Sequence, residues 1–85
     1  MNFRFTEHAL EQLERRGLDR VGVERVLEVP GQVIEQRLGR EARQSRVHFR
    51  DGEYLLRAIV DRRTDPPAVV TVYRTRYIAK YWRQE

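Results

Sequence analysis

The hydrophobic and polar positions of this 85-residue chain follow helical spacing near the N-terminus and strand-like alternation further along. Apolar residues at positions 9, 10 and 13 share one helix face, which predicts a helix from about Glu7 to Arg16. Thr6 is expected to cap its start and Gly17 to end it. A second helix is expected from about Arg20 to Glu28, between the capping residue Asp19 and the Pro30-Gly31 turn.

Apolar and polar residues alternate in the remaining segments, which predicts five strands in all. They cover about residues 3–5, 32–38, 40–50, 53–60 and 68–75, and the tail from position 76 is either a short helix or extended. Helices that precede a run of strands favour an α+β fold. We therefore expect one domain over residues 1–85, with two N-terminal helices packed on one face of a twisted antiparallel β-sheet.

The hairpin from Gln44 to Val60 gives the strongest functional indication in the sequence. Asp51-Gly52 between two alternating runs is typical of a two-residue hairpin turn, and that turn places Arg46 opposite Arg57. Directly opposed like charges destabilise a sheet, so this pair predicts an anion bound between them. The predicted core face carries Val47, Phe49, Tyr54, Leu56, Ala58 and Val60, and the opposite face carries Arg46, His48, Arg50 and Arg57.

The neighbouring strands extend this cationic face in the predicted register. Pairing Val60 with Val69 places Arg74 on the same face, and a turn at Gly39-Arg40 adds Val33, Glu35 and Arg37. The alternative interpretation is a solvated face whose arginine stems lie over Leu55 and Ile59.

The composition permits a nucleic-acid partner without requiring one. Seventeen basic residues against thirteen acidic ones give a net charge of +4, and all the basic residues except Lys80 are arginines. The planar guanidinium suits phosphate groups and base edges, although codon bias or a thermophilic source would also enrich arginine.

Several classes of protein are disfavoured by what the sequence lacks. There is no cysteine, and two histidines are too few for a convincing zinc site, so neither a disulfide framework nor a metal cofactor is expected. No apolar run approaches the length of a transmembrane helix, and the N-terminus has no signal-peptide core. We expect a cytoplasmic protein that does not act at a membrane.

Two further groups of side chains are candidates for chemistry. His8, in the first turn of the first helix, suits a general base, or it simply hydrogen-bonds near the helix start; Arg16 lies on the same flank. In the tail, Tyr77 and Tyr81 could stack on bases while Lys80 meets phosphate. For Trp82, packing of a terminal helix against the core is the favoured interpretation.

The segments FTEHALEQLERRGL, VLEVPGQVIE, YLLRAIV and TVYRTRYIAKYW together resemble a family of small domains of unknown function, DUF4258, which is related to the RelE/ParE/BrnT-type toxins. The resemblance implies the fold expected above. It also implies two activities, because RelE-like toxins cut mRNA without a metal through a basic sheet face, whereas ParE-like members inhibit a protein target. The residues on which the family pattern falls are His8, Arg16, Arg57, Tyr73, Lys80 and Tyr81.

The leading hypothesis is a toxin-like, metal-independent endoribonuclease that acts on RNA, including ribosome-associated mRNA. Its expected catalytic residues are His8, Arg57 and Tyr81, with His48 as an alternative proton carrier. Its expected RNA-binding residues are Arg16, Arg46, His48, Arg74, Tyr77 and Lys80. An acidic antitoxin protein is the expected partner. The alternatives are a non-catalytic RNA- or protein-binding module and a ParE-like inhibitor.

Overall fold

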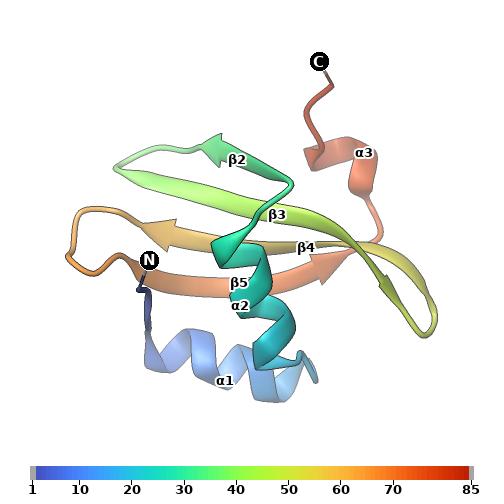
Figure 1. The fold of residues 1–85 in the computed structure, drawn as a ribbon, viewed down its shortest axis with the longest axis horizontal. Helices are drawn as coiled ribbons and strands as arrows, with labels where there is room; N and C mark the ends of the chain where they lie inside the picture. Colours follow the sequence, from blue (N-terminus) through green and yellow to red (C-terminus); the bar gives the residue numbers. More distant parts are fainter. Residues whose placement is uncertain (1, 85) are drawn as a thin grey trace.

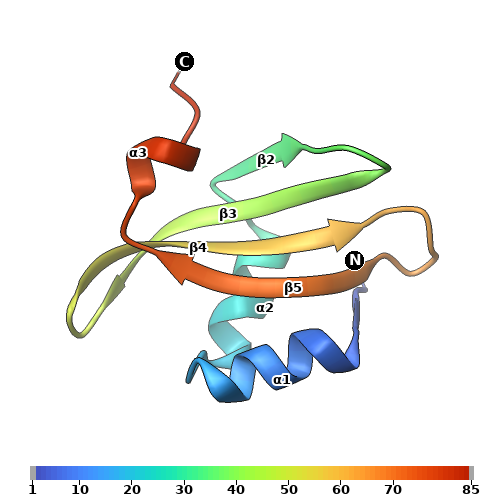
Figure 2. The ribbon, with the colours of Figure 1, turned by 180° about the vertical axis from the view of Figure 1, so that it is seen from behind.

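The computed structural model describes residues 2–84 and has an α+β fold, as the order of elements predicted (Figure 1). The described elements are β1 (Arg4–Phe5), α1 (Glu7–Arg15), α2 (Arg20–Glu28), β2 (Gln32–Glu35), β3 (Arg40–Phe49), β4 (Gly52–Asp61), β5 (Ala68–Thr75) and α3 (Ile78–Tyr81). Helices α1 and α2 lie on one side of the sheet, and the short α3 follows β5 near the C-terminus (Figures 1 and 2).

The sheet is mixed, and the expectation of a purely antiparallel sheet is wrong at its first strand. The strand order is β1-β5-β4-β3-β2, and β1 pairs parallel with β5, whereas the other neighbours are antiparallel. The Arg4 amide donates to the Pro67 carbonyl at 2.9 Å, and the Thr6 amide donates to the Val69 carbonyl at 3.1 Å. A two-residue strand carries no sequence pattern that indicates its partner.

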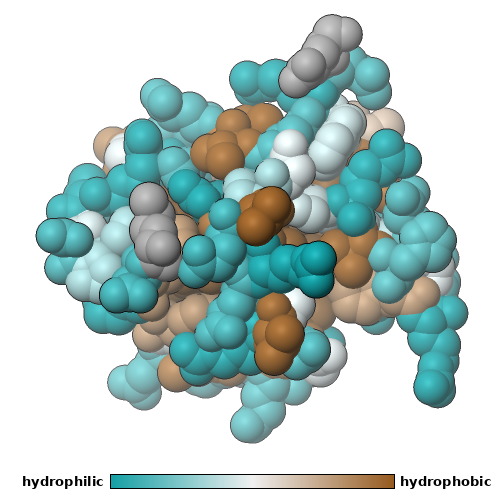
Figure 3. Space-filling view, viewed as in Figure 1, coloured by the Kyte–Doolittle hydropathy of each residue, from teal (hydrophilic) through white to brown (hydrophobic). Residues whose placement is uncertain are grey.

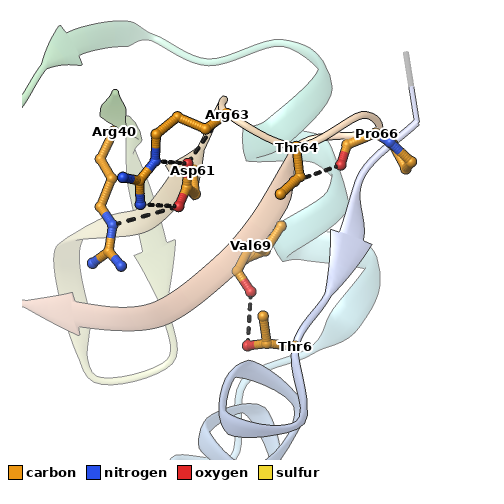
Figure 4. A network of polar contacts seen from close by, with 7 residues as sticks. All are labelled: Thr6, Arg40, Asp61, Arg63, Thr64, Pro66 and Val69. Atoms are coloured by element: carbon orange, nitrogen blue, oxygen red, sulfur yellow. Dashed lines mark hydrogen bonds and ion pairs between the residues drawn. The ribbon is translucent and has the colours of Figure 1, made fainter. Parts of the chain in front are cut away.

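The starts of both N-terminal helices follow from local capping, as predicted. The Thr6 hydroxyl accepts a hydrogen bond from the Ala9 amide at 3.1 Å, and the Asp19 carboxylate accepts one from the Val21 amide at 3.3 Å. The Thr6 hydroxyl also donates to the Val69 carbonyl at 3.0 Å (Figure 4). One side chain therefore both begins α1 and fixes it to β5.

The buried face of α1 differs from the predicted one. Leu10 remains 41% exposed, and the inward position is taken by Gln12. The Gln12 side-chain oxygen accepts hydrogen bonds from the Val72 amide at 2.9 Å and from the Thr71 hydroxyl. Beyond the short β1, the outer edge of β5 needs a hydrogen-bonding partner, so a polar side chain faces the sheet here.

The hydrophobic core lies between the two N-terminal helices and the sheet. Its buried members are Ala9, Leu13, Leu18, Val23, Val26, Leu27, Leu56, Ala58, Val60, Val69 and Val72. The β4 members are alternate residues of the strand, so the residues between them, including Arg57, point to the opposite face of the sheet.

A polar network at the end of β4 shapes the loop that leads into β5 (Figure 4). The Asp61 carboxylate accepts hydrogen bonds from the Arg63 amide at 2.9 Å and from the Arg63 guanidinium at 2.8 and 3.0 Å. These bonds hold the pKa of the Asp61 carboxyl well below its usual range. Arg40 approaches the same carboxylate at 4.0 Å, which links the start of β3 to the end of β4.

The central hairpin keeps its predicted faces but not its predicted pairing. Phe49 pairs with Gly52, so the turn lies at Arg50-Asp51, and Arg46 stands opposite Leu55 rather than Arg57. The partner strand has shifted by two residues, which leaves each side chain on its expected face. The Asp51 carboxylate accepts a hydrogen bond from Tyr54 at 2.7 Å and pairs with Arg76 at 3.3 Å, contacts that a local turn rule does not contain.

The register of β5 differs by one residue from the predicted one, and that of β2 by three, since Val33 pairs with Arg43. Val60 pairs with Val69 as expected, but a bulge follows, so Leu56 stands opposite Arg74 and Arg57 opposite Tyr73. Arg74 therefore lies on the helix side, not with Arg57. The turn before β3 is centred on Leu38 and Gly39, and it places Gln32 and Ile34, rather than Val33 and Glu35, on the face of Gln44.

Candidate functional site

The candidate site lies on the sheet face opposite α1 and α2, which we call the open face (Figure 2). At its centre the Arg57 guanidinium donates from Nε to the Gln44 side-chain oxygen at 2.8 Å and from Nη1 to the Tyr73 hydroxyl at 2.6 Å. The Tyr81 ring lies over the guanidinium, with its centroid 4.2 Å from Cζ. We call Gln44, Arg57, Tyr73 and Tyr81 the Arg57 cluster.

The charge of Arg57 is buried without an acidic partner. Its exposed fraction is 5%, and within residues 2–84 no carboxylate lies within ion-pair distance of it. The buried acids are paired: Glu41 contacts Arg43 at 2.6 Å, and Asp61 contacts Arg63. Buried charges normally have counter-charges, so Arg57, whose partners are neutral, is unusual among the buried ionisable groups of the described residues.

One donor of Arg57 remains available to such an anion. Nε and Nη1 are hydrogen-bonded, whereas Nη2 has no partner in the described chain. No fully buried side-chain nitrogen or oxygen of the described residues lacks a partner, so Nη2 must reach the surface. The cluster therefore keeps one guanidinium nitrogen, with its two N–H donors, at the surface.

Tyr73 adds a neutral hydroxyl beside this donor. Burial raises the pKa of the Tyr73 phenol above its ordinary value, although the neighbouring Arg57 acts in the opposite direction. The phenol therefore stays protonated at neutral pH. Its oxygen accepts from Arg57, and a side-chain hydrogen bond with Tyr81 also raises the pKa of the phenol.

The C-terminal tail is a short helix that rests on the open face. The Gln44 side-chain nitrogen donates to the Tyr81 carbonyl at 3.2 Å, and the Gln32 side-chain nitrogen donates to the Arg83 carbonyl at 2.7 Å. A Cβ atom on Gly31 would lie 3.1 Å from the Trp82 ring, so this ring packs closely on the start of β2. The tail therefore covers part of the Arg57 cluster.

Three predicted binding residues flank the cluster. Arg46 lies 5.7 Å from the Trp82 ring centroid and pairs with Glu53 at 3.3 Å, so its charge is partly balanced. The Lys80 ammonium lies 5.3 Å from the Tyr81 ring centroid. His48 is exposed on β3, two residues beyond Arg46 on the same face.

The structure does not bring the other predicted residues to this cluster. His8 is exposed on α1, and Arg16 caps the end of that helix, on the other side of the sheet from Arg57. Arg74 lies over the Tyr54 ring at 4.1 Å on the helix side, and Tyr77 is 73% exposed. Of the three predicted catalytic residues, Arg57 and Tyr81 are in contact, whereas His8 lies on the other side of the sheet.

Sequence reasoning missed Gln44 as a site residue and assigned Tyr73 to the other face. Gln44 stands directly opposite Arg57 once the pairing shifts by two residues, and the β5 bulge turns Tyr73 toward the guanidinium. Alternation alone placed Gln44 on the open face, so only the register was lacking.

Comparison with known families agrees with the resemblance to DUF4258 seen in the sequence. Residues 5–74 match the family described as Domain of unknown function (DUF4258). The chain belongs to the DUF4258 family. No curated protein and no solved structure matches it. The matched part of this DUF4258 domain includes Gln44, Arg57 and Tyr73, whereas Lys80 and Tyr81 lie beyond it.

Residues 2–84 lack two other kinds of feature. None of the helices there is long and apolar enough to cross a membrane. Nor do the described histidine, aspartate and glutamate side chains form a group of three or more that could hold a metal ion.

Proposed function

We propose that this DUF4258 domain binds RNA and that the Arg57 cluster takes a backbone phosphate. The observation that carries the proposal is the buried guanidinium that has no carboxylate partner and keeps one donor at the surface. A phosphate oxygen supplies the missing negative charge, and arginine binds phosphate with well-defined geometry. The aromatic rings beside it offer stacking surfaces for bases.

The same proposal places the domain among RelE/ParE-type folds, with the open face as the surface that meets RNA. Arg46, His48 and Lys80 would contact neighbouring phosphates, because they flank the cluster and are exposed.

Metal-independent cleavage is the second candidate, and the protonated Tyr73 beside Arg57 favours it. In this reaction the 2′-oxygen attacks phosphorus, and the bond to the 5′-oxygen breaks. Arg57 would stabilise the charge that develops on the phosphoryl oxygens, and Tyr73 would give its proton to the leaving 5′-oxygen. Solvent would take the 2′-proton, because the cluster itself contains no base.

The binding proposal is tested with a labelled single-stranded RNA and the Arg57→Ala variant. We expect Arg57→Ala to weaken binding by roughly tenfold or more, as for a lost hydrogen bond to a charged group. The slope of log affinity against log salt should fall by about one between about 50 and about 200 mM salt. Arg50→Ala, at the exposed hairpin turn, removes the same charge and should change affinity much less.

Expression of the same variants separates binding from cleavage. If the domain cuts RNA, the wild type should arrest growth and degrade mRNA, whereas Tyr73→Phe should bind RNA but leave it intact. A wild type that binds RNA without cutting it is a binding module. If the wild type does not bind RNA, or folded Arg57→Ala and Arg57→Lys bind like Arg50→Ala, the proposal is wrong. DNA damage without mRNA loss would indicate ParE-like inhibition.

A further inference from the structure

A second surface lies at the other end of β3, where the strand has no neighbour on its outer side. β2 pairs only with Glu41–Gln44, although β3 continues to Phe49. The Gly31 amide donates to the Ser45 hydroxyl at 2.9 Å, which marks where β2 begins. In the described chain, the backbone of residues 45–49 pairs with β4 alone. Its outward N–H and C=O groups are therefore an open strand edge.

This edge borders a groove against α2. The groove has a volume of about 320 Å³. One wall is formed by Gly22, Arg25 and Val26 of α2 and by Val29 at its C-terminal end, and the other by residues 45–48 of β3. A Cβ atom on Gly22 would meet no atom within 4 Å, so the space above this part of the helix is open. Apolar patches interrupt the hydrophilic surface over α2 (Figure 3).

The lining combines an apolar surface with positive charge. Val26 is buried beneath the groove, while Val29 is 74% exposed at its rim. Arg25, Arg46 and His48 also line the groove, and no carboxylate of residues 2–84 does. Arg46 pairs with Glu53, so Arg25 carries the less compensated charge.

We propose that this groove binds an extended, acidic segment of a partner protein, which adds to the sheet as a strand beside residues 45–49 of β3. A polypeptide fits better than a nucleic acid, because the edge offers backbone donors and acceptors at strand spacing. A second copy fits poorly, because antiparallel pairing about Val47 would bring a second Arg46, rather than an acidic side chain, to this basic edge. The inference does not depend on RNA binding at the Arg57 cluster.

The test uses a short blocked peptide of alternating glutamate and valine, and a matched peptide of alternating lysine and valine. In NMR titrations the acidic peptide should shift the amides of residues 45–49 and slow their hydrogen exchange. The basic peptide should bind at least about tenfold more weakly, which corresponds to a difference of about 1.4 kcal/mol. Central prolines should abolish binding of the acidic peptide, since they remove ladder donors.

Two variants connect the binding to the groove. Gly22→Leu should fill the open space and weaken the acidic peptide at least about tenfold, and RNA affinity should not change. Arg25→Glu should reverse the preference between the two peptides. Arg37→Glu makes the same charge change in the loop between β2 and β3, at the far end of the sheet, and should have little effect (Figure 1).

Several outcomes would overturn the proposal. They are no binding of the acidic peptide, equal binding by a folded Gly22→Leu variant, and shifts confined to the Arg57 cluster. Self-association that Gly22→Leu removes would assign the groove to a second copy instead. An RNA oligomer that displaces the acidic peptide and whose affinity falls in Gly22→Leu would assign the groove to nucleic acid.

Discussion

Most arginine side chains with described contacts act within the domain itself. Arg63 and Arg76 balance the charges of Asp61 and Asp51, and Arg20 lies 4.4 Å from the Phe5 ring centroid. Such contacts stabilise local structure and use the positive charge internally. Arg57 differs because its burial is combined with neutral partners. The basic composition therefore gives less information about function than the position of this one residue.

Asp61→Asn should lower stability near pH 7 and reduce the sensitivity of the domain to acid. The Arg63 hydrogen bonds lower the pKa of the folded-state carboxyl below the ordinary value of 3.8. The stabilisation is therefore fully present above that value, and it is lost as the pH falls through the lower folded-state pKa. Urea denaturation at several pH values should show a wild-type decline below about pH 4 that is weaker in Asp61→Asn.

Asp65→Asn is the matched control for this prediction. Asp65 is exposed in the same loop and makes no ion pair in the described chain. At each pH, Asp65→Asn should unfold at the same urea concentration as the wild type. An Asp61→Asn variant as stable as the wild type near pH 7 would show that the network in Figure 4 contributes nothing.

At the scale of elements, local chemistry predicted where helices begin, and long-range contacts decided how strands pair. The caps at Thr6 and Asp19 involve residues two or three positions away, so the sequence contains them. The hairpin register instead depends on Asp51, whose partner Arg76 belongs to a distant segment. The bulge beside Ile59 has no sequence signature, yet it exchanges the predicted faces of Tyr73 and Arg74. Tyr73 lies on the open face and Arg74 on the helix side.

The sequence likewise predicted the faces of the candidate site but not its residue pairing. Alternation placed Arg57 on the open face, and Tyr81 was predicted as a catalytic residue together with it. The anion argument from an Arg46–Arg57 pair is wrong, because Gln44 stands opposite Arg57. Arg57 remains the candidate anion-binding residue for another reason, namely its burial, which a sequence pattern does not report.

The turn between β2 and β3 leads to a prediction at this scale. Leu38 has φ of 59° and Gly39 has φ of 75°, a conformation that favours asparagine followed by glycine. Leu38→Asn should stabilise the domain by about 1 kcal/mol, because it removes the left-handed strain of a leucine that is 74% exposed. Urea denaturation measures this change. Leu10→Asn, within α1, should destabilise instead, and a destabilised Leu38→Asn would contradict the turn geometry.

Across the whole molecule, the sheet separates a closed side from a partly covered one. The side that faces α1 and α2 holds the core cluster, and no member of that cluster lies beyond Val72. The open face instead has the tail as its cover over Gln44 and Arg57. The tail should therefore contribute to stability without being required for folding.

A chain that ends at Tyr77 tests this arrangement. The truncation removes the Tyr81 ring above Arg57 and the hydrogen bonds that Gln32 and Gln44 donate to tail carbonyls. We expect a folded domain that is less stable by about 2–3 kcal/mol, from the sum of these modest terms. Circular dichroism and urea denaturation should show native secondary structure and a lower midpoint.

A chain that ends at Arg83 should match the wild type, because it keeps these contacts. Loss of folding in the shorter chain, or unchanged stability, would contradict this division between core and cover.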